Sequence, residues 1–237
     1  MMSKKYAKRG ISINAVLTAV VVLVAVCVIG GVLLLHGAGP GTASGASLRK
    51  PGSNTLTEAP GEKVTVVEFL DYQCPSCASY YDNVIKQLEQ DYTGRIDFVT
   101  RDFPLPVHAL AVPAAKAAEA AAMQGKYREM YHALYDGYES WAVAADGSSI
   151  SQDVSAARAR FDEFAMRIGL DLERFHRDMA SPQVMSKIEQ DRSDGAKAGV
   201  NGTPTFFING ELFEPSGRTY DEVSKQFRTE IDGILAR

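Results

Sequence analysis

The sequence predicts an α/β fold that carries a large helical insertion and is preceded by one transmembrane helix. Three observations lead to this fold class. Short apolar runs typical of strands lie near both ends of residues 63–237. The long stretch between them has the residue spacing of amphipathic helices. A continuous apolar run without charge lies close to the N-terminus.

The N-terminal segment divides into a basic stretch and an apolar stretch. Residues 15–35 are 21 positions without a formal charge, and about 20 apolar residues span the hydrocarbon core of a bilayer. We therefore predict a transmembrane helix at 14–36. Residues 1–13 are expected to stay in the cytoplasm because they hold the basic residues, which are Lys4, Lys5, Lys8 and Arg9. The alternative is a long signal peptide, for which 42–46 offers a weak cleavage site.

Residues 37–62 are predicted to be a flexible linker. They are rich in Gly, Ser, Thr, Ala and Pro and show no periodicity, which is typical of a tether. The folded domain is therefore expected to begin at Lys63 and to run to Arg237.

The first half of the predicted core is a strand, a helix and a second strand. The apolar run 64–70 reads as a buried strand. Pro75 suits the first position of a helix, because its missing N–H has no partner to lose there. Cys74 is then the N-cap and the helix continues to about Gln90. Residues 95–101 form the second strand, which a Pro-Leu-Pro sequence ends.

The helical insertion is predicted at about 107–199. Alanine-rich and amphipathic segments follow one another here, separated by glycines and by a loop at 139–151. Asp171 and Ser181 are candidate N-caps. The expected helices are 113–123, 126–138, 155–168, 172–180 and 183–198.

The chain returns to strand signals after the insertion. Residues 205–208 and 211–213 flank Asn209-Gly210, a strong hairpin turn. The segment 220–235 is an amphipathic helix. The hairpin must join the two earlier strands if all of them are to share one core, and this completes the α/β arrangement.

Cys74-Pro75-Ser76-Cys77 is the motif with the clearest chemistry. Two thiols three positions apart at a helix start can close into a disulfide and reopen, and the helix N-terminus stabilises a thiolate. Half a zinc site and an inert structural bridge are the alternatives. A structural zinc needs four ligands, whereas the third cysteine, Cys27, lies in the apolar N-terminal run and the histidines after it are scattered singly. No metal and no cofactor is therefore expected.

The charge distribution argues against nucleic-acid binding. The formal net charge is −4, and it becomes −8 once the four basic residues of the N-terminal segment are set aside. An acidic domain lacks the basic surface that phosphate backbones require.

These motifs together resemble the DsbA-like thiol:disulfide oxidoreductases of the thioredoxin superfamily, and most closely their membrane-anchored Gram-positive members. The resemblance rests on the C-P-S-C motif after an apolar strand and on Gly202-Thr203-Pro204 ahead of the hairpin. It covers nearly all of residues 63–237. It implies a thioredoxin-like fold with an inserted α-helical subdomain.

The resemblance also implies roles for five residues. Cys74 corresponds to the exposed nucleophilic cysteine and Cys77 to the buried resolving cysteine. Pro204 corresponds to a cis-proline that faces the active disulfide, and Thr203 to a position that tunes redox behaviour. Glu68 corresponds to a buried acid that assists proton transfer; its neighbours in the strand are apolar on both faces, so burial would raise its pKa.

The expected function is an extracytoplasmic oxidase that donates the Cys74–Cys77 disulfide to reduced exported proteins. The exported location and the Pro-Ser pair between the cysteines favour oxidation. An oxidase must be reoxidised, so a membrane quinone-linked partner of the DsbB or VKOR type is expected. The alternatives are a disulfide reductase or isomerase and a membrane-tethered peptide-binding chaperone. The expected location is the cell membrane, with a single pass.

Overall fold

The computed structural model describes residues 48–61 and 63–237, and within them the core is one five-stranded sheet. The strand order is β1-β3-β2-β4-β5. β2 and β3 pair in parallel, and the other neighbours pair antiparallel. The strands are β1 (Asn54–Thr57), β2 (Thr65–Leu70), β3 (Asp97–Asp102), β4 (Thr205–Ile208) and β5 (Glu211–Phe213). The hairpin therefore joins the earlier strands, as the sequence predicts.

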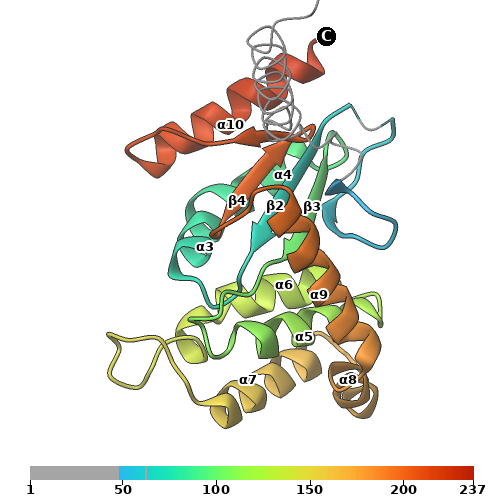
Figure 1. Ribbon diagram of the computed structural model, residues 1–237, viewed down its shortest axis with the longest axis vertical. Coiled ribbons are helices and arrows are strands. Elements are labelled where there is room, and N and C mark those ends of the chain that lie inside the picture. Colours follow the sequence, from blue (N-terminus) through green and yellow to red (C-terminus); the bar gives the residue numbers. More distant parts are fainter. Residues whose placement is uncertain (1–47, 62) are drawn as a thin grey trace, which may run out of the picture. The chain divides into compact units, whose positions relative to one another are not determined.

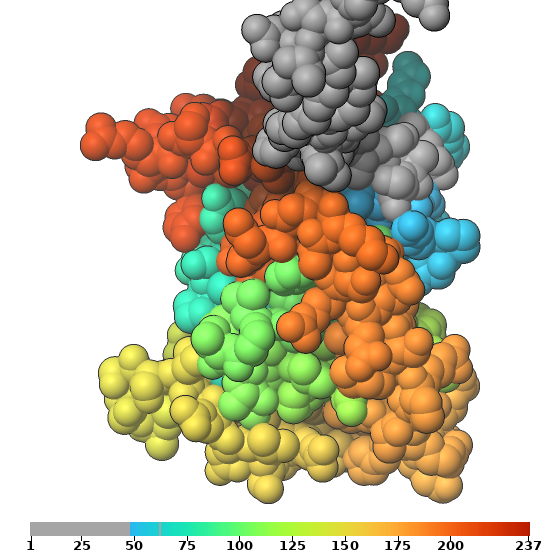
Figure 2. All heavy atoms as spheres, viewed as in Figure 1, coloured from blue at the N-terminus to red at the C-terminus, as the bar shows by residue number. Residues whose placement is uncertain are grey.

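Helices account for most of the remaining described residues. Figure 1 shows α5 to α8 gathered beyond one end of the sheet, and α9 leading from this group back to β4. The helices are α3 (Pro75–Tyr80), a π-helical turn (Tyr81–Ile85), α4 (Lys86–Tyr92), α5 (Ala111–Ala122), α6 (Tyr127–Asp136), a 3₁₀ turn (Tyr138–Ser140), α7 (Val154–Arg167), α8 (Leu172–Met179), α9 (Pro182–Lys197) and α10 (Tyr220–Leu235). The predicted helical insertion thus lies between β3 and β4, and its α5 to α9 form much of the face seen in Figure 2.

The central strand β2 is buried along its whole length because both faces of the sheet are covered. Val66 and Leu70 belong to the larger core cluster, together with side chains of α3, the π-helical turn, α4 and α10. Val67 and Phe69 belong to a smaller cluster on the opposite face. Successive side chains of a strand point to opposite faces, so Glu68 shares the face of Val66 and Leu70.

α9 approaches the opposite face of the sheet closely at Gly195. A Cβ atom at this position would lie 2.9 Å from the ring of Phe69 and 2.8 Å from that of Phe103. Glycine therefore permits the contact that seats the end of the helical insertion on the sheet.

The predicted linker at 37–62 is wrong in its second half. Residues 54–57 form edge strand β1, which pairs with β3 in a register that places Asn54 opposite Thr100. Leu48 is buried and Arg49 pairs with the buried Asp97. A strand at the edge of a sheet needs few apolar residues, and this segment is accordingly polar in sequence. The pairing of β1 and the burial of Leu48 show that the folded domain extends to residue 48 at least.

The predicted transmembrane helix at 14–36 and the cytoplasmic segment 1–13 lie outside the described residues. Within residues 48–61 and 63–237, no helix is long and apolar enough to cross a bilayer.

Local signals place the helix boundaries where the sequence predicts them. The side chains of Asp171 and Ser181 accept hydrogen bonds from the backbone N–H groups of Arg174 and Val184, which satisfies one unpaired donor in each first turn. Asn209 and Gly210 both have positive φ, 49° and 82°, the conformation that a two-residue hairpin turn requires.

Candidate active site

The cysteine motif begins where β2 ends. The Cys74 N–H donates to the Asp71 carbonyl oxygen over 3.0 Å, and this bond closes the turn between strand and helix. Cys74 has an extended backbone, φ −69° and ψ 122°, and Pro75 is the first helical residue. The local sequence therefore aims the free N–H groups of the first turn of α3 at the Cys74 sulfur.

Both cysteines are free thiols in this structure, and both are buried. Cys74 keeps 5% of its surface exposed and Cys77 keeps none. The resemblance implies that Cys74 is more accessible than Cys77, and this is confirmed. Its expectation that Cys74 is exposed is wrong. A reacting thiol can reach Cys74 through a small opening only, and it cannot reach Cys77 directly.

The surroundings of Cys74 stabilise its thiolate. The Cys77 thiol donates a hydrogen bond to it, and this is the largest cause that lowers the pKa of Cys74 to about 5 from an ordinary value of 9.0. Burial opposes the effect, and the N–H groups of Ser76 and Cys77 support it. Cys74 is therefore ionised at neutral pH, which makes it a good nucleophile and a good leaving group.

Cys77 has the opposite character. Burial in an apolar site is the largest cause that raises its pKa well above the ordinary value, and the adjacent Cys74 thiolate and Glu68 raise it further. The backbone N–H of Asp71 acts in the other direction. One thiol of the pair is thus ionised at neutral pH while the other keeps its proton.

The loop before β4 lies against Cys74. The Thr203–Pro204 peptide bond is cis, as the resemblance implies. The Cys74 Sγ lies 3.4 Å from the Thr203 carbonyl oxygen, which can accept the thiol proton at low pH. The buried Thr203 hydroxyl has no hydrogen-bond partner among the described residues, and Thr203 lies close enough to Cys74 to lower the pKa of that thiol. The structure thus brings Thr203 and Pro204 together with the cysteines.

Glu68 lies on the face of β2 that turns toward α3 and α6. It is 1% exposed, and the Tyr131 hydroxyl contacts its Oε2 at 3.5 Å. Burial raises the pKa of Glu68 to about 8, with only a partial offset from this contact. The carboxyl group is therefore protonated at neutral pH. It lies close enough to Cys77 to affect the pKa of that thiol.

Replacing Glu68 with glutamine is expected to stabilise the folded protein at high pH. Between the ordinary pKa of 4.5 and the folded value of about 8, folding takes up a proton, so the free energy of unfolding of the parent falls as pH rises. Glutamine cannot ionise. Urea unfolding in reducing buffer measures the free energy of unfolding of the variant minus that of the parent. This difference should be about 3 kcal/mol greater at pH 7.5 than at pH 5. A difference in free energy of unfolding that does not change with pH would mean that Glu68 titrates normally.

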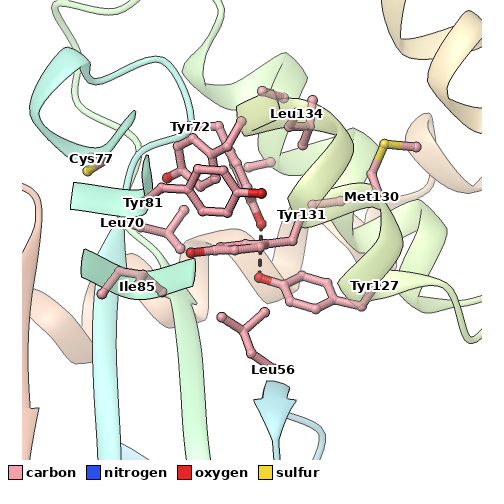
Figure 3. Packing of buried hydrophobic residues seen from close by; sticks show 14 of the residues in the cluster. Leu56, Leu70, Tyr72, Cys77, Tyr81, Ile85, Tyr127, Met130, Tyr131 and Leu134 are labelled. Atoms are coloured by element: carbon pink, nitrogen blue, oxygen red, sulfur yellow. Dashed lines mark hydrogen bonds between the residues drawn. The ribbon is translucent and has the colours of Figure 1, made fainter. Parts of the chain in front are cut away.

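A cluster of buried tyrosines lies behind the cysteines, and the sequence analysis does not single it out. Figure 3 shows Tyr72, Tyr81 and Tyr131 between α6 and the helix that carries Cys77, with the hydroxyls of Tyr72 and Tyr127 joined by a hydrogen bond of 2.9 Å. Tyr127, Tyr131 and Tyr135 recur every fourth residue, which puts them on one face of α6. That spacing is the sequence signal that could have identified the cluster.

Gln73 connects the cysteine turn to the helical insertion. Its side chain donates to the Ser151 carbonyl oxygen over 2.7 Å and accepts from the Leu110 N–H over 2.6 Å. The Tyr138 hydroxyl donates to the Gln73 carbonyl oxygen over 2.8 Å. These bonds fix the residue before Cys74 from three parts of the insertion, so the insertion holds the site as well as covering it.

Three buried carboxylates elsewhere in the described residues have the spacing of metal ligands. Asp102, Glu119 and Asp191 offer oxygen atoms within 4.8 Å of one another. The Lys187 ammonium group lies 2.5 Å from Asp191 and 3.4 Å from Glu119. A protein cation thus already occupies this group, and neither cysteine belongs to it.

The sheet order and the thiol pair at the start of the helix after β2 define a thioredoxin-like domain, with a cis-proline loop facing the thiols. A family model described as Thioredoxin matches residues 58–228. The chain therefore belongs to the thioredoxin family.

Solved structures narrow the resemblance to the DsbA group. A thioredoxin-like oxidoreductase from Silicibacter pomeroyi is 29% identical, with a TM-score of 0.61 over 80% of this chain and 96% of that chain. The thiol-disulfide exchange protein alpha-DsbA2 from Wolbachia pipientis is 25% identical, with a TM-score of 0.61 over 81% and 95%. The DsbA-like fold predicted from the sequence is confirmed.

Curated relatives contain the domain within longer proteins. A protein named Na(+)/H(+) antiporter NhaA 3 from Salinispora tropica is 37% identical over 154 residues, which are 65% of this chain. The match spans only 21% of that protein.

Proposed function

We propose that this protein is an extracytoplasmic thiol:disulfide oxidoreductase that works as an oxidase. The observation that carries the proposal is the contrast between the two thiols. The pKa of Cys74 is lowered to about 5, whereas burial raises that of Cys77 well above its ordinary value. A pair with one stabilised thiolate favours its reduced state and gives its disulfide away.

The reaction begins with the oxidised pair and a substrate thiolate. The thiolate attacks the Cys74 sulfur, a new S–S bond forms between substrate and Cys74, and the Cys74–Cys77 bond breaks. Cys77 leaves with the electron pair and takes up a proton, for which Glu68 is the nearby acid. A second substrate thiolate then attacks the substrate sulfur of the mixed disulfide. The Cys74 thiolate leaves, the substrate is oxidised by two electrons, and the dithiol is reduced.

The surroundings of the site support a protein substrate. A cavity of about 460 Å³ lies beside Pro75, between α3 and the segment that follows α6. Polar groups line much of it, among them Ser79, Asn83 and Ser149. An extended thiol-bearing segment could lie there and present its sulfur to the opening over Cys74.

The direction of the reaction follows from the stability of the reduced state. A Cys74 pKa of about 5 in place of 9.0 stabilises the dithiol at pH 7 by about 2.7 kcal/mol, which makes the pair about 60 mV more oxidising than one with ordinary thiols. This contribution supports an oxidase over the reductase and isomerase alternatives.

The experiment that tests the direction is a redox equilibrium with glutathione. The reduction potential of the Cys74–Cys77 pair should lie well above roughly −270 mV, the value for thioredoxin. A potential at or below that value would rule out the oxidase. Thr203→Val gives a second test. It removes a hydroxyl that stabilises the Cys74 thiolate, so it should lower the reduction potential of the Cys74–Cys77 pair.

We infer the cellular setting from the N-terminal sequence. An anchor at 14–36 would hold the domain outside the cytoplasm, where it meets reduced exported proteins. Reoxidation by a membrane quinone-linked partner of the DsbB or VKOR type would close the cycle. Loss of Cys74–Cys77 reoxidation in membranes depleted of quinone would support this partner class, and unchanged reoxidation would exclude it.

A further inference from the structure

Asp71 is a buried acid next to the cysteine motif that takes no part in the proposed exchange itself. Its side chain is fully buried, in the turn that leads from β2 to Cys74. Taking a carboxylate out of water is costly unless hydrogen bonds replace the lost solvent. The role of this acid is therefore to be found in the bonds that it makes.

Three partners converge on the Asp71 carboxylate. Its Oδ1 accepts from the Gln73 N–H over 2.8 Å. Its Oδ2 accepts from the Leu105 N–H over 3.0 Å, and the His108 Nδ1 lies 2.6 Å from the same oxygen. Two of these partners are backbone donors, and we assign the ring proton of His108 to Nδ1 so that the third partner donates as well. The carboxylate oxygens then only accept, which is the pattern of an ionised acid.

The backbone of the same residue holds Cys74. The Asp71 carbonyl oxygen accepts from the Cys74 N–H over 3.0 Å, and this bond closes the turn before α3. The Asp71 side chain meanwhile bonds Gln73 and the loop at 105–108, which precedes α5. One residue therefore ties the reactive cysteine to the segment that begins the helical insertion.

The position of this turn decides how well α3 stabilises the Cys74 sulfur. The N–H groups of Ser76 and Cys77 favour the thiolate only while they point at it. Hydrogen bonds weaken steeply when donor and acceptor are misaligned. A turn that is free to shift would therefore lose part of this stabilisation, even with α3 itself intact.

We propose that Asp71, held in place by His108, is a positioning residue that keeps Cys74 in the geometry from which it exchanges disulfides. Asp71 acts through the backbone turn, and His108 acts through Asp71. Loss of either side chain is expected to weaken the Cys74 thiolate by the same route. The inference rests on the proposed thiol–disulfide exchange but not on its direction.

Asp71→Asn and His108→Leu together test the proposal. Asparagine keeps the shape of Asp71 but has one acceptor oxygen in place of two. Leucine fills much of the space of the imidazole ring and donates no hydrogen bond. Titration of thiolate absorbance in the reduced protein should show that each variant raises the pKa of Cys74 by about one from the parent's value of about 5.

The direction of the shift separates positioning from a simple charge effect. Asp71→Asn removes a negative charge, which by electrostatics alone would lower the pKa of Cys74. Positioning predicts a rise in this variant as well as in His108→Leu. The double variant should match the larger of the two single effects, because both side chains act through one contact. A Cys74 pKa that is unchanged or lowered in Asp71→Asn would overturn the inference.

His108→Asn is the conservative variant, because its side-chain amide can donate to Asp71 from close to the position of Nδ1. It should keep the pKa of Cys74 near that of the parent, whereas His108→Leu should not. These two variants decide the question if Asp71→Asn does not fold. Equal Cys74 pKa values in His108→Asn and His108→Leu would contradict a role for the hydrogen bond to Asp71.

His176→Leu is the matched control, since His176 is an exposed histidine that pairs with Asp162 over 2.7 Å on α7 and α8. It should leave the pKa of Cys74 unchanged. The reduction potential keeps this inference separate from the proposed oxidase. A potential at or below that of thioredoxin, with the Cys74 pKa raised in both Asp71→Asn and His108→Leu, would reject the oxidase and keep the role of Asp71.

Discussion

Cys77→Ala is expected to trap this protein in mixed disulfides with its substrates, whereas Cys74→Ala is expected to trap none. Cys74 carries the ionised sulfur and the only opening to solvent at the pair, and Cys77 is fully buried with a raised pKa. Without Cys77, an adduct formed at Cys74 has no neighbouring thiol among the described residues to resolve it. Non-reducing gels and mass spectrometry of adducts formed with a cysteine peptide disulfide would measure the difference.

Catalytic turnover should fall to background in both variants, because neither can form the intramolecular disulfide that is transferred. The two variants control for each other, since each removes one buried sulfur from the same turn at the start of α3. The adduct on Cys77→Ala should form faster as pH rises through the pKa of Cys74, which this variant raises above the parent's value of about 5 because it removes the Cys77 hydrogen bond that lowers it most. Adducts of equal yield on Cys74→Ala would contradict the assignment of Cys74 as the attacking thiol.

The parts of this site that can be predicted from the sequence are those determined by residues adjacent in the chain. Pro75 fixes the helix start and makes Cys74 the N-cap, whatever the rest of the fold does. Asn209-Gly210 forces a tight turn in the same way. The burial of Glu68 also follows from neighbouring residues, because β2 is apolar on both faces.

Other features depend on partners far away in the sequence. β1 is a short polar strand whose assignment rests on its pairing with β3, more than forty residues later. The covering of Cys74 depends on the loop at Thr203, which lies 129 residues from it. No periodicity near residue 74 carries information about that loop. The resemblance implies that Pro204 faces the cysteines, but it also implies an exposed Cys74, which the fold buries.

The buried ion pairs of Arg101 also depend on partners that the sequence does not reveal. The sequence analysis does not predict whether Arg101 is buried. It is 1% exposed, and α9 brings Asp191 and Asp194 to it. The two acids lie three residues apart on one helix, which is a common surface pattern. Only the packing of α9 on the sheet turns this pattern into a binding site for a buried guanidinium group.

Arg101→Met should therefore destabilise the folded protein strongly. The guanidinium group donates to Asp191 and Asp194, each over 2.7 Å, and to the Leu48 carbonyl oxygen over 2.5 Å. Methionine takes the guanidinium donors away from these buried acceptors and leaves Lys187 as the cation beside Asp191. Removing one partner of a buried ion pair costs about 3–5 kcal/mol. Urea unfolding of the reduced protein at pH 7 would measure the loss.

Arg228→Met is the control for Arg101→Met, because Arg228 pairs with Asp91 at the surface, where both side chains are about a third exposed. Exposed pairs contribute about 0–1 kcal/mol, so this variant should unfold almost like the parent. High salt should weaken the surface pair and leave the effect of Arg101 unchanged, since buried charges are screened little. Equal stabilities of the two variants would show that the Arg101 network contributes no more than a surface ion pair, and that apolar contacts alone seat α9 on the sheet.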